Sequence, residues 1–291
     1  MKKALIIGSA VADITIRVDH LPALEEDVNP TSQSMQLGGC ACNVSHMFEL
    51  LRVPYTLAAP VGKGIYGDFV RKELQKRQVP ILFESEEENG CCYCIVDKEG
   101  RRTFMALHGA EYRFQAEWFA SLDAAEYGMA YCTGFEIQEE SGDHIVDFLA
   151  AHPELPFCYA PGTQIASVDH DRQERLLDLH PLLHLNLREA REYLRCGDDI
   201  RSCAERLFVR TQNTVIITDG ANGCLLYDEE GCIEQEAFPV KVVDSTGAGD
   251  SHIGTYLALI CAGKKKKEAL REAARIGAKV CEVHGPVLEE L

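Results

Sequence analysis

Short apolar runs alternate with helix-spaced apolar positions along most of the chain. Val44, Met47, Phe48 and Leu51 recur at the spacing of one helical face, and residues 4–7 form an apolar run of strand length. The same alternation predicts strands at 55–61, 129–133, 157–160, 183–187 and 214–218, and helices at 68–78, 172–179 and 188–195. Strands interleaved with helices predict right-handed crossovers and a mostly parallel α/β sheet covered on both faces.

Two segments, at about 14–37 and 91–108, contain extended pieces without intervening helices. In the second segment, a turn at 97–100 separates two strand-like runs and predicts a β-hairpin. Strands from these two insertions predict a small second sheet at the edge of the parallel core, where it is placed to act as a lid. No long linker divides the chain, so we expect a single domain over residues 1–291.

The net charge narrows the range of partners. The 291 residues include 46 acidic and 29 basic side chains, which gives a formal net charge of −17. A surface this acidic repels phosphate backbones, so we expect no nucleic-acid partner. The lysine run at 264–267 is the local exception, and we expect it to be a solvated helix start.

Neither the apolar runs nor the cysteines indicate a secreted or membrane protein. No run approaches the ~18–20 apolar residues of a membrane span, and no plausible cleavage site follows the N-terminal apolar stretch. We therefore expect a cytoplasmic protein without a membrane partner. Thirteen cysteines, an odd number at irregular spacing, predict reduced thiols. Cys40, Cys42 and the cluster at 91–94 lack the usual zinc-ligand spacing and are expected to be small buried hydrophobes.

The stretch VDSTGAGDSH at 243–252 places bare backbone between two aspartates. We expect residues 241–244 to be a strand or its end and residues 249–261 to be a helix. Gly247, Ala248 and Gly249 then form a helix N terminus, where unpaired amides and the helix dipole favour an anion.

Asp250 would lie in the first turn of that helix, beside a bound phosphoryl group. An anion-binding turn next to a base suits phosphoryl transfer to an alcohol. The helix N terminus should lower the pKa of Asp250, which makes it a weak base. The plain alternative is a tight turn in which Asp250 only complements the helix dipole.

Four motifs together resemble the ribokinase-like (PfkB) family of carbohydrate and nucleoside kinases. They are GGCACNVS at 38–45 followed by Gly62, NLRE at 186–189, TDGANG at 218–223 and DSTGAGDSHIG at 244–254. The resemblance implies a three-layer fold with a mostly parallel sheet flanked by helices and a small β-sheet lid. It also implies an ATP-dependent kinase that phosphorylates a primary hydroxyl of a sugar or sugar derivative, with a nucleoside as the alternative substrate.

The same resemblance implies roles for residues on the acceptor side. Asp250 would be the catalytic base, and Gly247, Ala248 and Gly249 would form the anion hole. The substrate hydroxyls would be bound by Asp13, Gly38, Gly39 and Asn43. The sequence independently favours this placement, because a carboxylate and an amide after strand ends suit a ligand crevice.

Nucleotide and metal sites follow from the other motifs. Asn186 and Glu189 would organise Mg²⁺ around ATP, with Glu189 acting through water. The pocket for the nucleotide would be shaped by Thr218, Gly220 and Gly223. Asp244 and Ser245, with the 281–285 loop, would hold a monovalent cation such as K⁺ through backbone oxygens. Relatives in the family also suggest a homodimer that pairs its lids.

Several positions depart from the family pattern. His252 replaces a customary aromatic residue beside the cofactor, which leaves the nucleotide preference open. The segment APGT at 160–163 lacks the Asp-Pro pattern of several sugar-acid and fructose kinases, so the substrate stays open. The remaining histidines, His184 among them, show no ligand spacing and are expected at surface or capping positions. Glu136 and Glu139 follow the strand at 129–133 and are further candidates to reach substrate.

Two functions of other classes stay open. Gly62, Gly64 and Gly67 match the G-x-G-x-x-G fingerprint between a strand and a helix, the layout of an NAD(P)-dependent oxidoreductase. A non-catalytic sensor that keeps only the ligand site is the other alternative.

Overall fold

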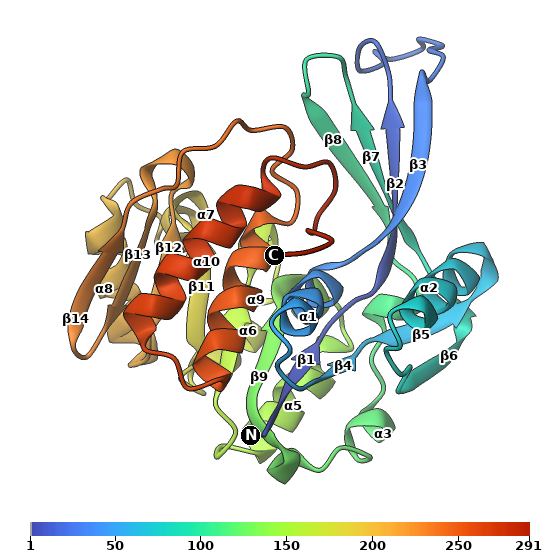
Figure 1. Cartoon of the computed structure of the whole chain (residues 1–291). Helices are drawn as coiled ribbons and strands as arrows, with labels where there is room; N and C mark the ends of the chain where they lie inside the picture. The colour runs from blue at the N-terminus through green and yellow to red at the C-terminus, as the bar shows by residue number, and fades with distance from the viewer. Residues whose placement is uncertain (1) are drawn as a thin grey trace.

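An eight-stranded sheet runs through the molecule (Figure 1). The computed structural model describes residues 2–291. Along the sheet the strands follow the order β4 (Tyr55–Ala58), β1 (Lys3–Ile7), β9 (Tyr127–Thr133), β10 (Phe157–Ala160), β11 (Leu182–Asn186), β12 (Val215–Thr218), β13 (Cys224–Asp228) and β14 (Gly231–Gln235). Neighbours from β4 to β12 are parallel, and β13 and β14 return antiparallel.

Helices cover both faces of this sheet. One face carries α1 (Cys40–Leu50), α9 (Ala248–Cys261) and α10 (Lys266–Val280), and the other carries α5 (Gly142–Ala151), α6 (His170–Leu177), α7 (Leu187–Leu194) and α8 (Ile200–Thr211). Successive side chains of a strand point to opposite faces of the sheet, so each buried strand contributes to both hydrophobic cores. In β1, Leu5 and Ile7 face one helical layer, and Ala4 and Ile6 face the other. The mostly parallel, three-layer α/β architecture predicted from the alternation is confirmed.

A four-stranded sheet stands apart from the large one in Figure 1, and we call it the lid sheet. Its order is β3 (Ser32–Gly38), β2 (Val11–Arg17), β7 (Cys91–Val96) and β8 (Arg102–Leu107). Asp13 is in register with Gln36 and Cys92, so these side chains share one face, the inner face, which also carries Phe104. The strands come from the two segments without helices, and their action as a lid stays a prediction.

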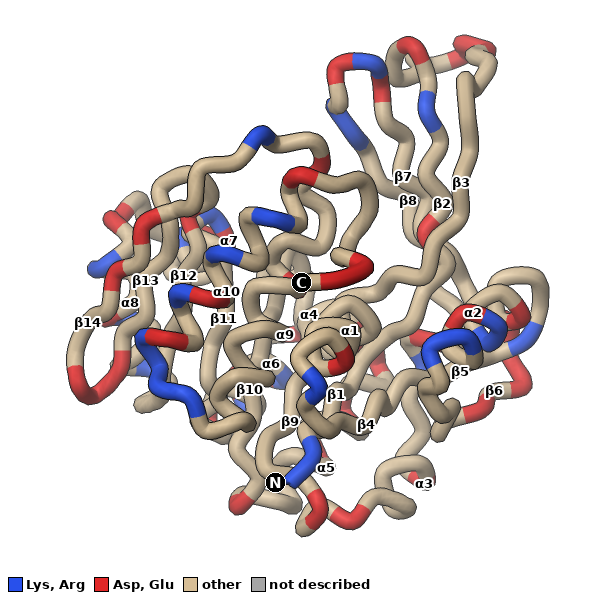
Figure 2. Tube along the Cα trace, in the orientation of Figure 1, with Lys and Arg blue, Asp and Glu red and all other residues tan. Residues whose placement is uncertain are grey.

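The remaining elements connect these layers. They are β5 (Pro60–Lys63), α2 (Gly64–Lys76), β6 (Phe83–Glu88), α3 (Ala116–Phe119) and α4 (Gly134–Ile137), with 3-10 turns at Ala110–Tyr112, Ala124–Glu126, Gly162–Ala166 and Gly220–Asn222. Charged residues occupy helices and loops on all sides of the trace rather than one patch (Figure 2). The helix α10 begins within the lysine run, as the sequence predicts.

Two predicted strands are wrong. Residues 55–61 form two strands that belong to different sheets, because β4 joins the large sheet whereas β5 pairs with β6. Residues 241–244 form a loop in which Val242 and Val243 are exposed. The amides of Val243 and Asp244 both donate to the Cys281 carbonyl instead of to a neighbouring strand.

The G-x-G-x-x-G match serves packing, and the oxidoreductase alternative is wrong. It lies at the β5–α2 junction, outside the large parallel sheet. A Cβ at Gly62 would lie 2.2 Å from the Glu87 carbonyl oxygen, and a Cβ at Gly67 would lie 2.3 Å from that of Gly62. Both glycines are therefore required by close backbone contacts, without a dinucleotide.

Within residues 2–291, no helix is both long and apolar enough to cross a membrane. The same residues contain no group of three or more His, Cys, Asp or Glu side chains that is arranged to hold a metal ion. All thirteen cysteines are free thiols, and Cys42 and Cys91 are buried.

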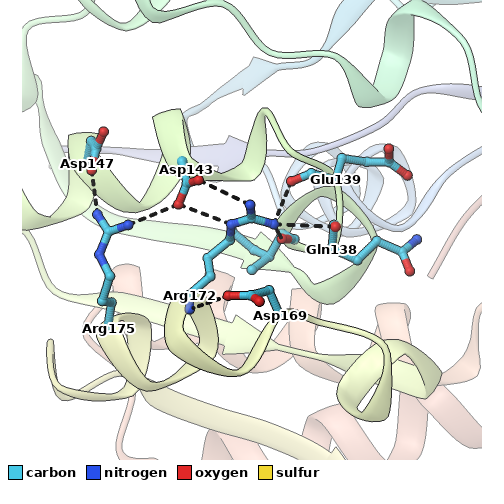
Figure 3. A network of polar contacts seen from close by, with 8 residues as sticks. Gln138, Glu139, Asp143, Asp147, Asp169, Arg172 and Arg175 are labelled. Carbon is cyan, nitrogen blue, oxygen red and sulfur yellow. Dashed lines mark hydrogen bonds and ion pairs between the residues drawn. The ribbon is translucent and has the colours of Figure 1, made fainter.

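Arg172 ties α6 to the loop that follows α4 (Figure 3). Its guanidinium donates to the carbonyl oxygens of Ile137 and Glu139 at 2.8 and 2.7 Å and to both carboxylate oxygens of Asp143 at 3.1 Å. The Arg172 side chain is 11% exposed, whereas that of neighbouring Arg175, which also binds Asp143, is 48% exposed. Arg172 thus supplies a donor to the carbonyl oxygens of Ile137 and Gln138, and a second donor to that of Glu139, which also accepts from the Gly142 amide.

We expect Arg172→Met to lower the free energy of unfolding by ~2–3 kcal/mol, because buried carbonyls and Asp143 lose a charged donor. The matched variant Arg175→Met removes an exposed ion pair and should cost less than about 1 kcal/mol. Urea denaturation of both variants measures the difference, and equal losses would contradict the assignment.

Candidate active site

The N terminus of α9 presents unpaired amides. Gly247 has a φ of 73°, and a Cβ there would lie 2.0 Å from the Pro286 carbonyl oxygen, so only glycine fits. Among residues 2–291, the amides of Gly247, Gly249 and Asp250 donate to no protein acceptor. The Ala248 amide, also predicted to form the anion hole, instead donates to the Ser245 carbonyl oxygen at 3.4 Å. The space beside the Cα of Gly249 is open. This geometry suits an anion at the positive end of the helix.

Asp250 follows these amides and is fixed from α1. The side-chain amide of Asn43 donates to Asp250 Oδ2 at 2.8 Å. Burial raises the pKa of Asp250 to about 6, although hydrogen bonds from Asn43 and Cys40 oppose the shift and the charge of Glu189 adds to it. The expectation of a lowered pKa is therefore wrong, because the loss of water outweighs the helix dipole. A carboxylate with this pKa is mostly ionised at neutral pH and still basic enough to accept a proton.

Asp13 lies next to Asp250, on the inner face of the lid sheet. Burial, with the charge of Asp250 as a second cause, raises the pKa of Asp13 to about 7. A Cβ on Gly38 would lie 1.9 Å from Asp13 Oδ2, and Gly39, with a φ of 94°, lies against the Ser9 carbonyl oxygen. These glycines let the chain pass directly beside the carboxylate. The structure thus brings the four predicted substrate residues, Asp13, Gly38, Gly39 and Asn43, to one side of Asp250.

We call residues 247–250 the catalytic turn, and a cavity of about 540 Å³ opens on its other side. Thr218, Gly220 and Gly223 line it together with Ala248 and Gly249, so the predicted nucleotide residues and two residues of the predicted anion hole share one space. Most of the remaining wall comes from the 237–242 loop and from α10, and consists of small or apolar side chains. Size, apolar walls and free amides at one end fit a nucleotide whose phosphates reach Gly249.

Asn186 and Glu189 form a capping box at the start of α7. Asn186 donates from its backbone and side-chain nitrogens to Glu189 at 3.0 and 2.6 Å, and its Oδ1 accepts from the Glu189 amide at 2.9 Å. Burial raises the pKa of Glu189. The pair does not line the cavity, but the charge of Glu189 acts on Asp250. Each carboxylate oxygen accepts one of these hydrogen bonds and keeps a lone pair, which fits Mg²⁺ held through water and substrate phosphates.

His252 lines the cavity and pairs with His184 from β11. The ring nitrogens His252 Nδ1 and His184 Nε2 are 3.1 Å apart, and the two rings stack. Burial lowers the pKa of His252 to about 4, and it also lowers that of His184. Both rings are therefore neutral at physiological pH. The expectation that His184 lies at the surface is wrong, because it faces the buried side of a strand.

Glu136 and Glu139 already have hydrogen-bond partners within the fold. Glu136 is fully buried and accepts hydrogen bonds from the Ser9 amide and the Thr133 hydroxyl. The Glu139 carboxylate oxygen Oε1 is hydrogen-bonded to His108 Nδ1 at 2.7 Å. Both glutamates therefore support the junction between the large sheet and the lid sheet.

Asp244 and Ser245 directly precede the catalytic turn. Their side chains both bind the guanidinium of Arg102, which comes from the lid sheet. Arg102 and the 237–242 loop are the parts of the site that the sequence does not indicate, since they reach it through tertiary contacts and no motif marks them. Cys40 lies within the motif at 38–45, but its hydrogen bond to Asp250 was not predicted.

The chain is similar to known kinases over nearly its whole length. The sequence profile described as "pfkB family carbohydrate kinase" matches residues 1–290. Identity to the uncharacterized sugar kinase YegV of Escherichia coli K12 is 28%, over 92% of this chain and 85% of that protein. Identity to the ketohexokinase of Mus musculus is 24%, over 98% of this chain and 97% of that protein.

Solved structures give the same fold. The ribokinase of Thermotoga maritima superposes with a TM-score of 0.85 at 19% identity, over 98% of this chain and 95% of that chain. The nucleoside kinase of Methanocaldococcus jannaschii superposes with a TM-score of 0.79 at 20% identity, over 98% of this chain and 93% of that chain. The predicted ribokinase-like fold is confirmed.

The raised pKa of Asp13 predicts a pH-dependent stability. Asp13 has an ordinary pKa of 3.8 and a folded-state pKa of about 7. Its favourable contribution is therefore complete below pH 3.8 and is lost as the pH rises through 7. We expect Asp13→Asn to raise the free energy of unfolding by ~1–3 kcal/mol more at pH 8 than at pH 4.

Urea denaturation of wild type and variant at both pH values measures this difference. Asp27→Asn, at an exposed position, is the matched control and should show no such change. An Asp13→Asn effect that is the same at both pH values would contradict the buried charge.

Proposed function

We propose that this chain, which belongs to the pfkB family of carbohydrate kinases, uses ATP to phosphorylate a primary hydroxyl of a sugar or sugar derivative. Its reaction is the transfer of a phosphoryl group to an alcohol of a sugar or nucleoside. The observation that carries the proposal is the position of Asp250. Its carboxylate lies beside free amides, with the cavity on one side and Asp13 and Asn43 on the other. A base between a donor pocket and a group of hydroxyl-binding residues is the arrangement that phosphoryl transfer to an alcohol requires.

Each group has a role in this reaction. The amides of Gly247, Gly249 and Asp250 bind the transferred phosphoryl group as its charge develops. Asp250 accepts the proton of the attacking hydroxyl. Asp13 and Asn43 orient the acceptor. Mg²⁺, held through water by Glu189, would neutralise the phosphates of ATP.

The lid sheet completes the site. Asp13 lies on its inner face, so a movement of this sheet carries a substrate-binding carboxylate with it. Closure of the lid sheet over the acceptor would exclude water, which strengthens the hydrogen bonds to the transferred group and prevents hydrolysis of ATP.

A sugar is favoured by the polar groups on the acceptor side. Two carboxyl groups and a carboxamide, from Asp13, Asp250 and Asn43, offer partners to several hydroxyls. Of the four relatives reported above, three are named as kinases of sugars and one as a nucleoside kinase. Phe104, on the inner face and 52% exposed, favours the second candidate, because it offers an aromatic surface to a nucleobase.

We propose a homodimer that pairs the outer faces of the lid sheets. Met35, Met105 and Leu107 lie opposite the inner face and are 37%, 54% and 60% exposed. Apolar side chains gathered on one face of a sheet are typical of an association surface.

The cytoplasmic location of the protein stays a prediction.

A substrate panel with Asp250→Asn tests the kinase. We expect ADP release with at least one sugar among pentoses, hexoses, sugar acids and nucleosides, and a loss of at least about 100-fold in kcat for the variant. The wild-type kcat/KM should fall as the pH drops through about 6, because Asp250 becomes protonated.

Asp147→Asn, which alters a surface ion pair, is the control and should keep wild-type activity. Phosphorylation of a nucleoside but of no sugar would select the second candidate. Wild-type turnover by Asp250→Asn would refute the role of the base and favour a different catalytic group.

Sedimentation velocity tests the dimer. We expect wild type to sediment as a dimer and Met105→Glu to shift toward the monomer, because a buried charge opposes association. Glu99→Gln, on the hairpin turn, should leave the dimer unchanged. A monomeric wild type at micromolar concentration would refute the proposal.

A further inference from the structure

One guanidinium from the lid sheet binds the three side chains directly ahead of the catalytic turn. Arg102 Nη1 donates to Asp244 Oδ1 and, at 2.9 Å, to Thr246 Oγ1, while Nη2 donates to Ser245 Oγ at 2.6 Å. Arg102 is the first residue of β8 and is 142 residues away from Asp244 along the chain. Its side chain is 27% exposed. These contacts join the tip of the lid sheet to the loop that ends at Gly247.

Two oxygen atoms at this loop, Asp244 Oδ1 and the Cys281 carbonyl oxygen, already accept several hydrogen bonds. Besides Arg102, Asp244 Oδ1 accepts from the Thr246 amide at 2.9 Å and from the Thr246 hydroxyl at 2.7 Å. The Cys281 carbonyl oxygen accepts from the amides of Val243 and Asp244. A monovalent cation needs free oxygen lone pairs, and a carboxylate oxygen with three donors has none left. Asp244 Oδ1 is therefore closed to the cation that the family resemblance implies. The Arg102 guanidinium, bound to the side chains of Asp244 and Ser245, also repels a second cation held beside it by backbone oxygens.

Asp244 is held ionised at this point. Burial raises the pKa of Asp244, but hydrogen bonds from Thr246 and Arg102 and the charge of Arg102 outweigh it, so that the net shift is downward. An uncompensated anion just ahead of the anion hole would repel the phosphates of an incoming nucleotide. Arg102 removes this repulsion and fixes three consecutive side chains of the loop.

We propose that Arg102 is a positioning residue that supplies, from the lid sheet, the positive charge that a bound monovalent cation would otherwise supply, so that the enzyme works without K⁺. The charge is tethered to the lid, and the catalytic turn is therefore complete only when the lid sheet lies against it. A second contact also joins the lid sheet to the segment beside this loop, because Arg17 of β2 donates to His284 Nδ1 at 3.2 Å. This inference rests on the proposed kinase function.

The test compares wild type, Arg102→Met and Arg102→Lys with the matched control Arg101→Met. Arg101 is the preceding residue, is 69% exposed and pairs with Asp97 and Glu99 on the hairpin rather than with the catalytic loop. Phosphoryl transfer and melting temperature are measured in KCl and in tetramethylammonium chloride at equal ionic strength.

We expect K⁺ to leave wild type and Arg101→Met unchanged in both measurements. Arg102→Met should lose about 10-fold or more in kcat/KM without K⁺, because three charge-assisted hydrogen bonds are gone. Millimolar K⁺ or guanidinium chloride should restore part of this loss, and K⁺ should raise the melting temperature of Arg102→Met alone. Arg102→Lys, which keeps the charge, should fall between the two.

Three results would overturn the proposal. They are stimulation of wild type by K⁺, Arg102→Met activity equal to wild type, and a loss in Arg102→Met that neither ion restores. If wild type phosphorylates nothing in the substrate panel, the proposed function fails by itself. The melting temperatures in K⁺ then still decide the role of Arg102.

Discussion

The hydrogen bond from Asn43 to Asp250 joins the N-terminal turns of two helices that are 207 residues apart in sequence. It connects the acceptor side of the site, on α1 and the lid sheet, with the donor side, on α9 and the cavity. The bond also opposes the burial of Asp250, so that this carboxylate keeps a pKa of about 6 rather than becoming a permanently protonated acid. The proposed chemistry depends on this balance, since a base must be ionised before it can accept a proton.

The architecture was largely predictable from the sequence because its signals are local. Apolar periodicity depends on neighbours in the chain, and it located β10, α6 and α9 to within a few residues. The two wrongly predicted strands lie where contacts with distant parts of the chain determine the backbone structure. The break between β4 and β5 comes from a change of sheet partner, and the loop at 241–244 has its hydrogen bonds with Cys281.

The site was predictable in its backbone and less so in its electrostatics. Glycine at 38 and 247 indicates close approaches, and the structure identifies what approaches, namely the Asp13 carboxylate and the Pro286 carbonyl. The pKa of Asp250 was predicted in the wrong direction, because burial depends on parts of the chain far from the motif. Arg102 and the stacked pair of His184 and His252 carry no local pattern, since only the assembled fold brings their partners near.

Residues 281–286 contact the cavity, the 243–247 loop and the lid sheet. Cys281 lines the cavity and binds the 243–244 backbone, His284 meets the lid sheet through Arg17, and the Pro286 carbonyl lies against Gly247. A ribosome delivers this segment after all of its partners. The loop at 243–244 and the turn at Gly247 thus acquire these partners only at the end of chain synthesis. A partly made chain would therefore lack the contacts that fix the catalytic turn.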